Sequence, residues 1–486
     1  MSRGIPAGIE SMVGVEAERI RVLNNAPPRR SGRYVVYWSQ MNRRVDSNHA
    51  LAHAAGLANE HGVPLLIYEG LTCTYKAAND RIHTFMLEAV PGMAGAAKRI
   101  HAGYFFYLRA RRGDPNDILY RLAVNAVCVV TDDYPTFIAA DHNFRVPGKI
   151  GVAFSAVDSS CIVPMSRHEK RAYGAYTIRP KITRELPLYL KPVEAPVLRH
   201  RWQDDLLPED LAMHRTRVAE LKVAELVAQC EIDHSVKPSL SFTGGATAAR
   251  KLLDLFIHKK LSRYARESNQ PSKHATSDLS PYLHFGHISS LEVALEAKRH
   301  ADEHKLMAGE FLEELIVRRE LAFNFARFAS NVESFDELPE WCRKTMREHA
   351  GDQRTHLYSR DQLLCAETYD SLWNATQKEL LLRGKIHGYY RMYWGKKIIE
   401  WTKTYDEALR IMIDFHDVYA LDGRDPNTYA NILWLFGLHD RPWTARPVFG
   451  QLRYMSYDGM KRKTDIDSYV REIAYLERTG KDPFRI

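Results

Sequence analysis

The chain has 486 residues, of which 45% are hydrophobic and 26% charged, so it is too long for one ordinary core and too apolar to be disordered. Lysine and arginine number 68 against 60 aspartates and glutamates, and the formal net charge of +8 favours an anionic partner such as nucleic acid. The alternative is that the excess of positive charge is scattered over the surface and forms no binding site. The cysteines are widely spaced and form no C-x-x-C pair, which argues against a disulfide framework and against a metal site.

No segment approaches the roughly 20 consecutive apolar residues of a membrane span. Residues 1–30 carry acidic residues and arginines where a signal peptide needs an apolar stretch, and they predict a flexible N-terminal tail. We therefore expect a cytoplasmic monomer with no membrane partner.

Residues 31–178 predict an α/β, Rossmann-like domain with a parallel sheet. Apolar, β-branched runs at 34–38, 64–68 and 126–131, and a weaker run at 149–153, predict strands, and the stretch 50–59 predicts a helix. Such alternation is typical of parallel α/β domains. No G-x-G-x-x-G or G-x-x-x-x-G-K-[ST] follows any of these runs, so a nucleotide-like ligand would have to bind in another way.

The second half of the chain predicts an all-α domain. Prolines at 180, 187, 192, 196 and 208 predict an irregular interdomain linker over residues 179–208. Beyond it, amphipathic stretches such as 310–328 and 377–402 alternate with short turn clusters. We expect residues 209–486 to form this helical domain.

Hydroxyl groups gather in the segment T-S-D-L-S-P-Y-L-H-F-G at 276–286, around a proline that can start a helix. Such a helix N-terminus suits a phosphate group, although a cap that only starts the helix is the alternative. The whole run resembles the segment with which photolyases and cryptochromes hold the pyrophosphate of FAD. The resemblance implies an FAD-binding domain whose cofactor contacts include Tyr264, Thr276, Ser277, Leu279 and Ser280.

The segment E-E-L-I-V-R-R-E-L at 313–321 places Glu314 and Arg318 four residues apart on one face of a helix. Alone, this would be an ordinary surface pair. The segment resembles the photolyase helix whose glutamate hydrogen-bonds the damaged base. The resemblance implies that Glu314 binds the DNA lesion.

Tryptophans mark the segment H-G-Y-Y-R-M-Y-W-G-K-K-I-I-E-W at 387–401. Trp394 and Trp401 share a helical face, which for an isolated pair indicates core aromatics. Together with L-W-N at 372–374, the segment resembles class II photolyases, whose tryptophans relay an electron to the flavin. Trp394 would then lie nearest the flavin, Trp373 would be the outer relay and Trp401 a side branch. The resemblance also implies that Met392 presses on the lesion and that Arg391 contacts the cofactor.

The segments L-D-G-R-D-P-N-T-Y-A-N-I-L-W at 421–434 and R-P-V-F-G-Q-L-R-Y-M-S at 446–456 carry the strongest resemblance. The first alone would predict a turn. Together they resemble class II cyclobutane pyrimidine dimer photolyases. That family stacks a flipped dimer where Trp434 stands and grips DNA phosphate where Arg453 stands, and it implies Asp422 and Asp425 as cofactor residues.

Three positions depart from the class II pattern. His416 stands where an asparagine faces the flavin, and a histidine there could donate a hydrogen bond but titrates near neutrality. Ser268 replaces an arginine that follows the FAD tyrosine, and Thr428 replaces a glycine.

The resemblance implies a carbon–carbon lyase that repairs cyclobutane pyrimidine dimers in DNA, by light-driven electron transfer from reduced FAD to a flipped-out lesion. A cryptochrome-like photoreceptor is the alternative, slightly favoured by His416 and Ser268, and a flavoprotein with another substrate is a third. The presence of Glu314, Met392 and Trp434, which the resemblance assigns to the lesion pocket, favours repair over signalling. An antenna chromophore, 8-hydroxydeazaflavin or folate, gains no support, because the N-terminal half resembles the family only in general terms.

Overall fold

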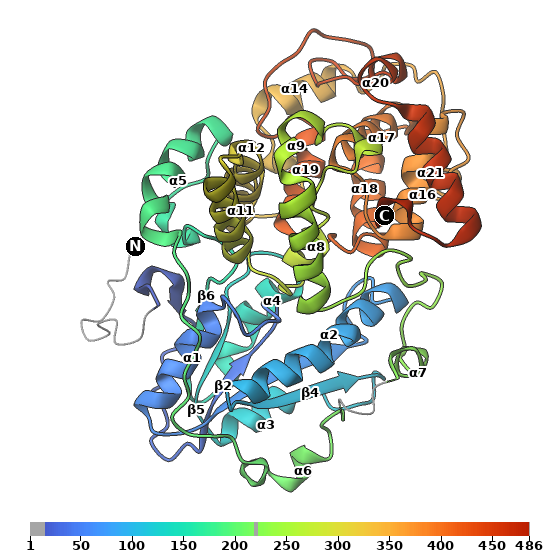
Figure 1. Ribbon diagram of the computed structural model, residues 1–486. Coiled ribbons are helices and arrows are strands. Elements are labelled where there is room, and N and C mark those ends of the chain that lie inside the picture. Colours follow the sequence, from blue (N-terminus) through green and yellow to red (C-terminus); the bar gives the residue numbers. More distant parts are fainter. Residues whose placement is uncertain (1–14, 218–221, 486) are drawn as a thin grey trace.

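A computed structural model describes residues 15–217 and 222–485, which form an α/β domain and a helical domain packed against it (Figure 1). The six-stranded sheet has the order β1-β6-β5-β2-β3-β4, and every strand pair is parallel except β1 with β6. The strands are β1 Ile20–Val22, β2 Tyr34–Trp38, β3 Leu65–Thr72, β4 Gly103–Arg109, β5 Ala126–Asp132 and β6 Ala153–Val157. This architecture confirms the predicted fold class.

The predicted strands match the most buried part of the sheet. Every residue of β2 and β5 is buried, because parallel strands covered on both faces read as continuous apolar runs. The weaker run at 149–153 is misplaced, since β6 begins at Ala153 and Pro147–Lys149 form a 3₁₀ turn. The short β1 and the long β4 are additional strands.

The predicted tail over residues 1–30 is wrong from residue 15 onward. Arg19 is 1% exposed and its guanidinium donates to the carbonyl oxygens of Asp158, Cys161 and Ile162. β1 then pairs with the edge strand β6. The hydrophobicity pattern does not predict β1 because the segment contains polar residues. The first fourteen residues of the predicted tail lie outside the residues that the structure describes.

Helices cover both faces of the sheet: α1 His49–Glu60, α2 Asp80–Arg99, α3 Ile118–Val124 and α4 Phe137–Arg145. One hydrophobic cluster continues from the α1 and α2 side of the sheet into the helical domain, and it includes Phe85 of α2 with Phe256 and Tyr282 of that domain. The two domains therefore share a core.

The predicted linker over 179–208 is irregular from residue 190 to residue 203, but its first part is helical, and the predicted domain start at 209 differs from the structure. Helix α5 spans Ala175–Tyr189 with two prolines inside it, because burial of Ile178 and Ile182 outweighs the helix-breaking tendency of proline. The short helices α6 Glu209–Ala212 and α7 Val223–Ala228 then follow the α/β domain (Figure 1). Thr216 N and Glu231 N donate to the carbonyl oxygens of Phe106 and Ala110, in and just after β4, each at 2.8 Å.

The helical domain begins at α8. Its helices are α8 Ala246–Lys259, α9 Leu261–Glu267, α10 Ser280–His284, α11 Ser290–His304, α12 Gly309–Leu312, α13 Arg319–Phe328, α14 Glu340–Glu348, α15 Arg360–Leu364, α16 Ser371–Arg383, α17 Gly388–Trp401, α18 Tyr405–Tyr419, α19 Pro426–Leu435, α20 Tyr457–Lys463 and α21 Ile466–Thr479. A π-helix over Glu313–Arg318 joins α12 to α13. The predicted stretch 377–402 is interrupted at Gly384, whose φ of 77° ends α16. Within the described ranges, no helix is long and apolar enough to cross a membrane.

Arg81 on α2 fastens the two domains together. Its side chain is 2% exposed and donates to four carbonyl oxygens, three of them in the helical domain, at Leu380, Leu381 and Tyr419. Burial lowers the pKa of Arg81 to about 10, so the guanidinium keeps its charge at neutral pH.

Replacing Arg81 by methionine should lower the free energy of unfolding by about 3 kcal/mol or more, because buried carbonyl groups lose a charged donor. The matched variant Arg99→Met, exposed at the end of the same helix, should change it by less than about 0.5 kcal/mol. Urea denaturation followed by circular dichroism measures both, and equal midpoints for the two variants would contradict this role of Arg81.

Candidate functional site

Three segments that are distant in sequence meet at the carboxylate of Asp422. Ser280, the first residue of α10, donates its hydroxyl to Asp422 Oδ2 at 2.7 Å. Arg391 of α17 donates to both carboxylate oxygens at 3.0 Å. Burial raises the pKa of Asp422, but the charges of Arg391 and Lys385 outweigh it and hold this pKa below its usual value. Three of the predicted cofactor residues thus lie together.

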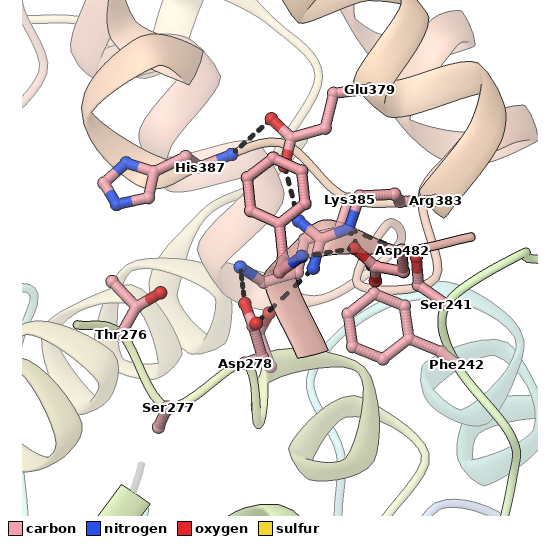
Figure 2. Close-up of polar contacts among 12 residues, drawn as sticks. Ser241, Phe242, Thr276, Ser277, Asp278, Glu379, Arg383, Lys385, His387 and Asp482 are labelled. Atoms are coloured by element: carbon pink, nitrogen blue, oxygen red, sulfur yellow. Dashed lines mark hydrogen bonds and ion pairs between the residues drawn. The ribbon is translucent and has the colours of Figure 1, made fainter. Parts of the chain in front are cut away.

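The predicted phosphate-binding segment is anchored by a buried ionic cluster (Figure 2). Asp278 has a φ of 56°, and its carboxylate accepts from Lys385 Nζ at 2.8 Å and lies 3.4 Å from the guanidinium of Arg383. Arg383 also pairs with Glu379 at 2.6 Å. Thr276 and Ser277 are thereby held next to the connection between α16 and α17.

Cations around this segment are the functional residues that the sequence did not reveal. Lys260 Nζ donates to the carbonyl oxygen of Thr276 at 3.3 Å, and Arg383 and Lys385 contact Asp278. The three are spread over more than a hundred positions, so no local spacing points to them. Three carboxylates, those of Asp278, Glu379 and Asp482, accompany these three cations, so the cluster serves mainly to fix the segment in place.

Two buried donors near the start of α17 have no hydrogen-bond partner in the described residues, Arg391 Nε and His387 Nε2. His387 Nδ1 accepts from Tyr389 N at 3.2 Å, so the ring proton is on Nε2. Burial, with the charge of Lys385 nearby, lowers the pKa of His387 to about 3 and keeps the ring neutral. Unpaired buried donors need an acceptor, and a phosphate- and carbonyl-bearing cofactor such as FAD supplies several. The residues present therefore fit the cofactor.

The remaining predicted cofactor residues have other surroundings. Tyr264 on α9 packs against Phe311 with ring centroids 5.4 Å apart, and Leu279 is 1% exposed, which leaves mainly its backbone for a cofactor contact. Asp425 lies at the domain interface, where it accepts from Tyr134 OH at 2.7 Å and caps the first turn of α19. The structure thus gives Asp425 a role in joining the domains.

His416 lies beside Trp394, with ring centroids 5.2 Å apart. Its Nδ1 is 2.8 Å from the carbonyl oxygen of Met412, so Nδ1 carries the proton and Nε2 is an acceptor. Burial, and then the charge of Arg391, lowers the pKa of His416 to about 4. The expectation of a histidine that titrates near neutrality is therefore wrong, and in this tautomer Nε2 cannot donate a hydrogen bond.

The three predicted relay tryptophans form a continuous row. The rings of Trp394 and Trp373 are parallel, with centroids 6.4 Å apart, and Trp373 and Trp401 meet edge to face at 5.6 Å. All three are 0% exposed. Trp373 lies next to Trp394 and between the other two rings, and Trp401 extends the row beyond Trp373.

Two of the predicted DNA-binding residues, Trp434 and Arg453, meet at the carboxyl end of α19. Trp434 is half-buried, and the guanidinium of Arg453 lies 5.0 Å from its ring and 4.4 Å from that of Trp443. Arg453 also donates to Asp440 at 3.2 Å. The guanidinium thus supports Trp434, and Met392 packs against the same hydrophobic cluster.

The π-helix changes the surroundings of Glu314. Its wider turn brings residues five apart together, and Arg318 forms its ion pair with Glu313 at 3.4 Å, although its charge still acts on Glu314. Arg179 of α5 holds Glu313 through two hydrogen bonds of 3.0 and 2.6 Å. Glu314 is left exposed to solvent, yet desolvation by the surrounding protein raises its pKa.

A cavity of about 420 Å³ opens in the α/β domain at the carboxyl ends of β2, β3 and β4. Trp38, Thr72 and Arg109, the last residues of these strands, line it. Its other cationic lining residues are Arg43, Arg145, Lys149 and Arg424. Open α/β sheets bind ligands at this edge, where the strand order reverses, so this cavity is a second candidate site.

Comparison with known proteins identifies the family. Residues 35–197 match the family model described as DNA photolyase. The deoxyribodipyrimidine photo-lyase of Methanothermobacter thermautotrophicus is 38% identical over 95% of this chain and 99% of its own length, and that of Oryza sativa subsp. japonica is 38% identical over 95% and 92%.

Two further proteins resemble this chain at lower identity or over a shorter length. An archaeal photolyase structure from Sulfolobus tokodaii with two FAD molecules has a TM-score of 0.63, 16% identity and coverage of 92% of this chain and 91% of that one. Cryptochrome-1 of Sinapis alba is 38% identical, but over only 15% of this chain and 17% of its own length. From the full-length similarity to deoxyribodipyrimidine photo-lyases, this chain belongs to the DNA photolyase family.

Proposed function

We propose that this protein binds FAD and uses light to repair cyclobutane pyrimidine dimers in DNA. The observation that carries the proposal is the meeting of Ser280, Arg391 and Asp422 in a chain that matches relatives named deoxyribodipyrimidine photo-lyase over 95% of its length. Sequence similarity to Cryptochrome-1 of Sinapis alba covers 15% of the chain, whereas sequence similarity to the deoxyribodipyrimidine photo-lyases covers 95%, which favours repair over signalling. Class II membership is part of the proposal and rests on the motifs at 393–397 and 421–434.

Each group of residues then has a task. When bound, reduced FAD supplies the electron that light drives onto the dimer and that returns once the two pyrimidines have separated. Ser280, Arg391 and the cations around Asp278 hold the cofactor, and Arg391 Nε and His387 Nε2 find acceptors on it. His416 offers Nε2 as an acceptor to the cofactor ring.

The DNA lesion is bound by Trp434, Met392 and Glu314. Trp434, supported by Arg453, stacks on a dimer that has been flipped out of the duplex, and flipping costs least at a lesion because stacking is already weakened there. Met392 packs on the lesion, and Glu314 hydrogen-bonds its polar edge. A raised pKa of Glu314 helps this carboxyl to hold or share a proton near the anionic pyrimidine.

The reduced, FAD-loaded protein should remove dimers from an oligonucleotide under blue light and leave them intact in the dark. Trp434→Ala should weaken lesion binding about 10-fold, because base stacking on an aromatic side chain contributes about 1–3 kcal/mol. The control Tyr475→Ala removes a partly exposed aromatic ring on α21 and should repair normally. Recovery of thymine absorbance measures repair, and an FAD-loaded protein that binds the lesion without repairing it would favour the signalling alternative.

We also propose that the pair Arg179–Glu313 positions Glu314 by stabilising the π-helix. Glu313→Gln and Arg179→Ala should each raise KM for the dimer several-fold, consistent with about 1 kcal/mol for a two-bond ion pair, while kcat changes little. The double variant should be no worse than either single variant, because both remove one interaction.

Arg299→Ala provides the control for this pair, since it removes exposed ion pairs on α11. It should leave KM unchanged. An unaltered KM in Glu313→Gln would contradict the proposed positioning role.

We propose further that the cavity at the carboxyl ends of β2, β3 and β4 holds a light-harvesting chromophore. Its lining combines the rings of Trp38, Tyr68 and Tyr107 with several cations, which suits a planar aromatic molecule that carries negative charge. The photolyase of Sulfolobus tokodaii, whose structure contains two FAD molecules, is described as having a novel light-harvesting cofactor.

Added 8-hydroxydeazaflavin or methenyltetrahydrofolate should bind this cavity, and Thr72→Trp should abolish binding by filling it, with FAD uptake unchanged. Val124→Trp adds the same side chain at an exposed position of α3 and should have no effect. Fluorescence titration measures binding of each compound, and tight binding of either to Thr72→Trp would exclude this cavity as its site.

A further inference from the structure

The row of tryptophans has no exposed member. Trp394, Trp373 and Trp401 are each 0% exposed, so a reductant in solution cannot contact any of them. A relay that is refilled from solution needs a redox-active group at the surface within contact of its last buried ring. The residues around Trp401 are therefore the place to look for its terminus.

Two tyrosines contact Trp401. The ring centroids of Tyr358 and Tyr369 lie 5.4 and 5.6 Å from that of Trp401. Tyr369 is 59% exposed, whereas Tyr358 is half-buried and its phenol oxygen accepts from Tyr369 N at 3.1 Å. Tyr369 is thus the only one of the two that is largely open to solvent.

The position of Tyr369 is fixed by its neighbours in the chain. Asp370 follows it, caps α16 by accepting from Trp373 N at 2.9 Å, and also accepts from the hydroxyl of Tyr393. On the other side of Tyr369, the backbone of Thr368 exchanges two hydrogen bonds with the side chain of Asn374 on α16, so the chain on both sides of Tyr369 is tied to the helices that carry the tryptophans. The Tyr369 ring therefore stays in contact with Trp401 while part of it remains exposed to solvent.

A charged pair lies beside Trp401. Lys397 Nζ lies 5.5 Å from the Trp401 ring centroid and pairs with Glu400 at 2.8 Å. The carboxylate of Glu400 offsets the ammonium charge, so this pair does not hold a positive hole on Trp401. Trp401 Nε1 has no hydrogen-bond partner in the described residues, and the indole N–H groups of Trp373 and Trp394 donate to amide oxygens, which are poor bases. The row therefore contains no base that would neutralise the hole by taking its proton.

We propose that Tyr369 is the terminal electron donor of the tryptophan relay, an inference that rests on the proposed function. Trp394 loses an electron to the light-excited, oxidised cofactor and is refilled in turn by Trp373 and Trp401. Tyr369 then gives one electron to Trp401 and its phenolic proton to water, which leaves a neutral tyrosyl radical. A thiol in solution returns a hydrogen atom to the phenoxyl oxygen and becomes a thiyl radical.

Flash photolysis and freeze-trapped electron paramagnetic resonance of the oxidised, FAD-loaded protein test this assignment. The wild type should give a long-lived tyrosyl signal that forms more slowly in D₂O, because a proton leaves with the electron. Tyr369→Phe keeps the aromatic ring but lacks the phenolic hydroxyl. In this variant a tryptophan radical should replace the tyrosyl radical and should decay by recombination. Steady photoreduction with thiol should then fall several-fold. Tyr358→Phe should behave as the wild type, and Trp394→Phe should give no protein radical.

The outcomes separate this proposal from the function on which it rests. A tyrosyl signal that survives in Tyr369→Phe but disappears in Tyr358→Phe would assign the terminus to Tyr358 and overturn the proposal. A tryptophan radical as the final species in the wild type would overturn it too, while repair remains intact. A wild-type protein that takes up no FAD would overturn the proposed function and this proposal with it.

Discussion

The loop between α18 and α19 is the constraint on which both candidate sites depend, and the Asp422 carboxylate is its centre. Through this group the loop binds α10 and α17, and Leu421 N donates to the carbonyl oxygen of Gly384 at 2.7 Å. A Cβ at Gly423 would lie 2.2 Å from His416 O, so only glycine permits the backbone to pass so close to α18. This loop and the ion pairs of Asp278 with Arg383 and Lys385 together fix the predicted phosphate-binding segment relative to the helices that carry the tryptophan row.

The same loop reaches the α/β domain within two residues. Arg424 lines the cavity at the sheet edge while its guanidinium donates to the carbonyl oxygens of Asp417 and Ala420. Asp425 then accepts from Tyr134. A ligand in the cavity and a cofactor in the helical domain would thus contact opposite ends of one short, rigid segment, which suits the transfer of excitation energy between fixed partners.

The sequence predicts the parts of this structure that follow from local patterns. The strands β2, β3 and β5 and the helices around the tryptophans follow from runs and spacings, and family resemblance singles out Ser280, Arg391 and Asp422, which the structure brings together. Local sequence patterns do not predict long-range contacts. The cations around Asp278, the clamp of Arg179 on Glu313 and the tautomer of His416 each depend on a partner that sequence spacing cannot identify.

The errors have physical causes too. Prolines predict a linker where burial of Ile178 and Ile182 stabilises α5, and charged residues predict a tail where Arg19 finds three carbonyl acceptors. An α-helical spacing predicts a pair of Glu314 with Arg318 that the π-helix replaces with one to Glu313. In each case tertiary contacts outweigh the local preference.

The hydrophobic cluster shared by the two domains also bears on how this protein can be engineered. Phe85 of α2 packs within 5.3 Å of Tyr282 and 5.2 Å of Phe285, measured between ring centroids. Exchanging the α/β domain for that of another protein would therefore require redesign of both sides of this contact. A helical half expressed alone would present these aromatic rings to water and tend to aggregate.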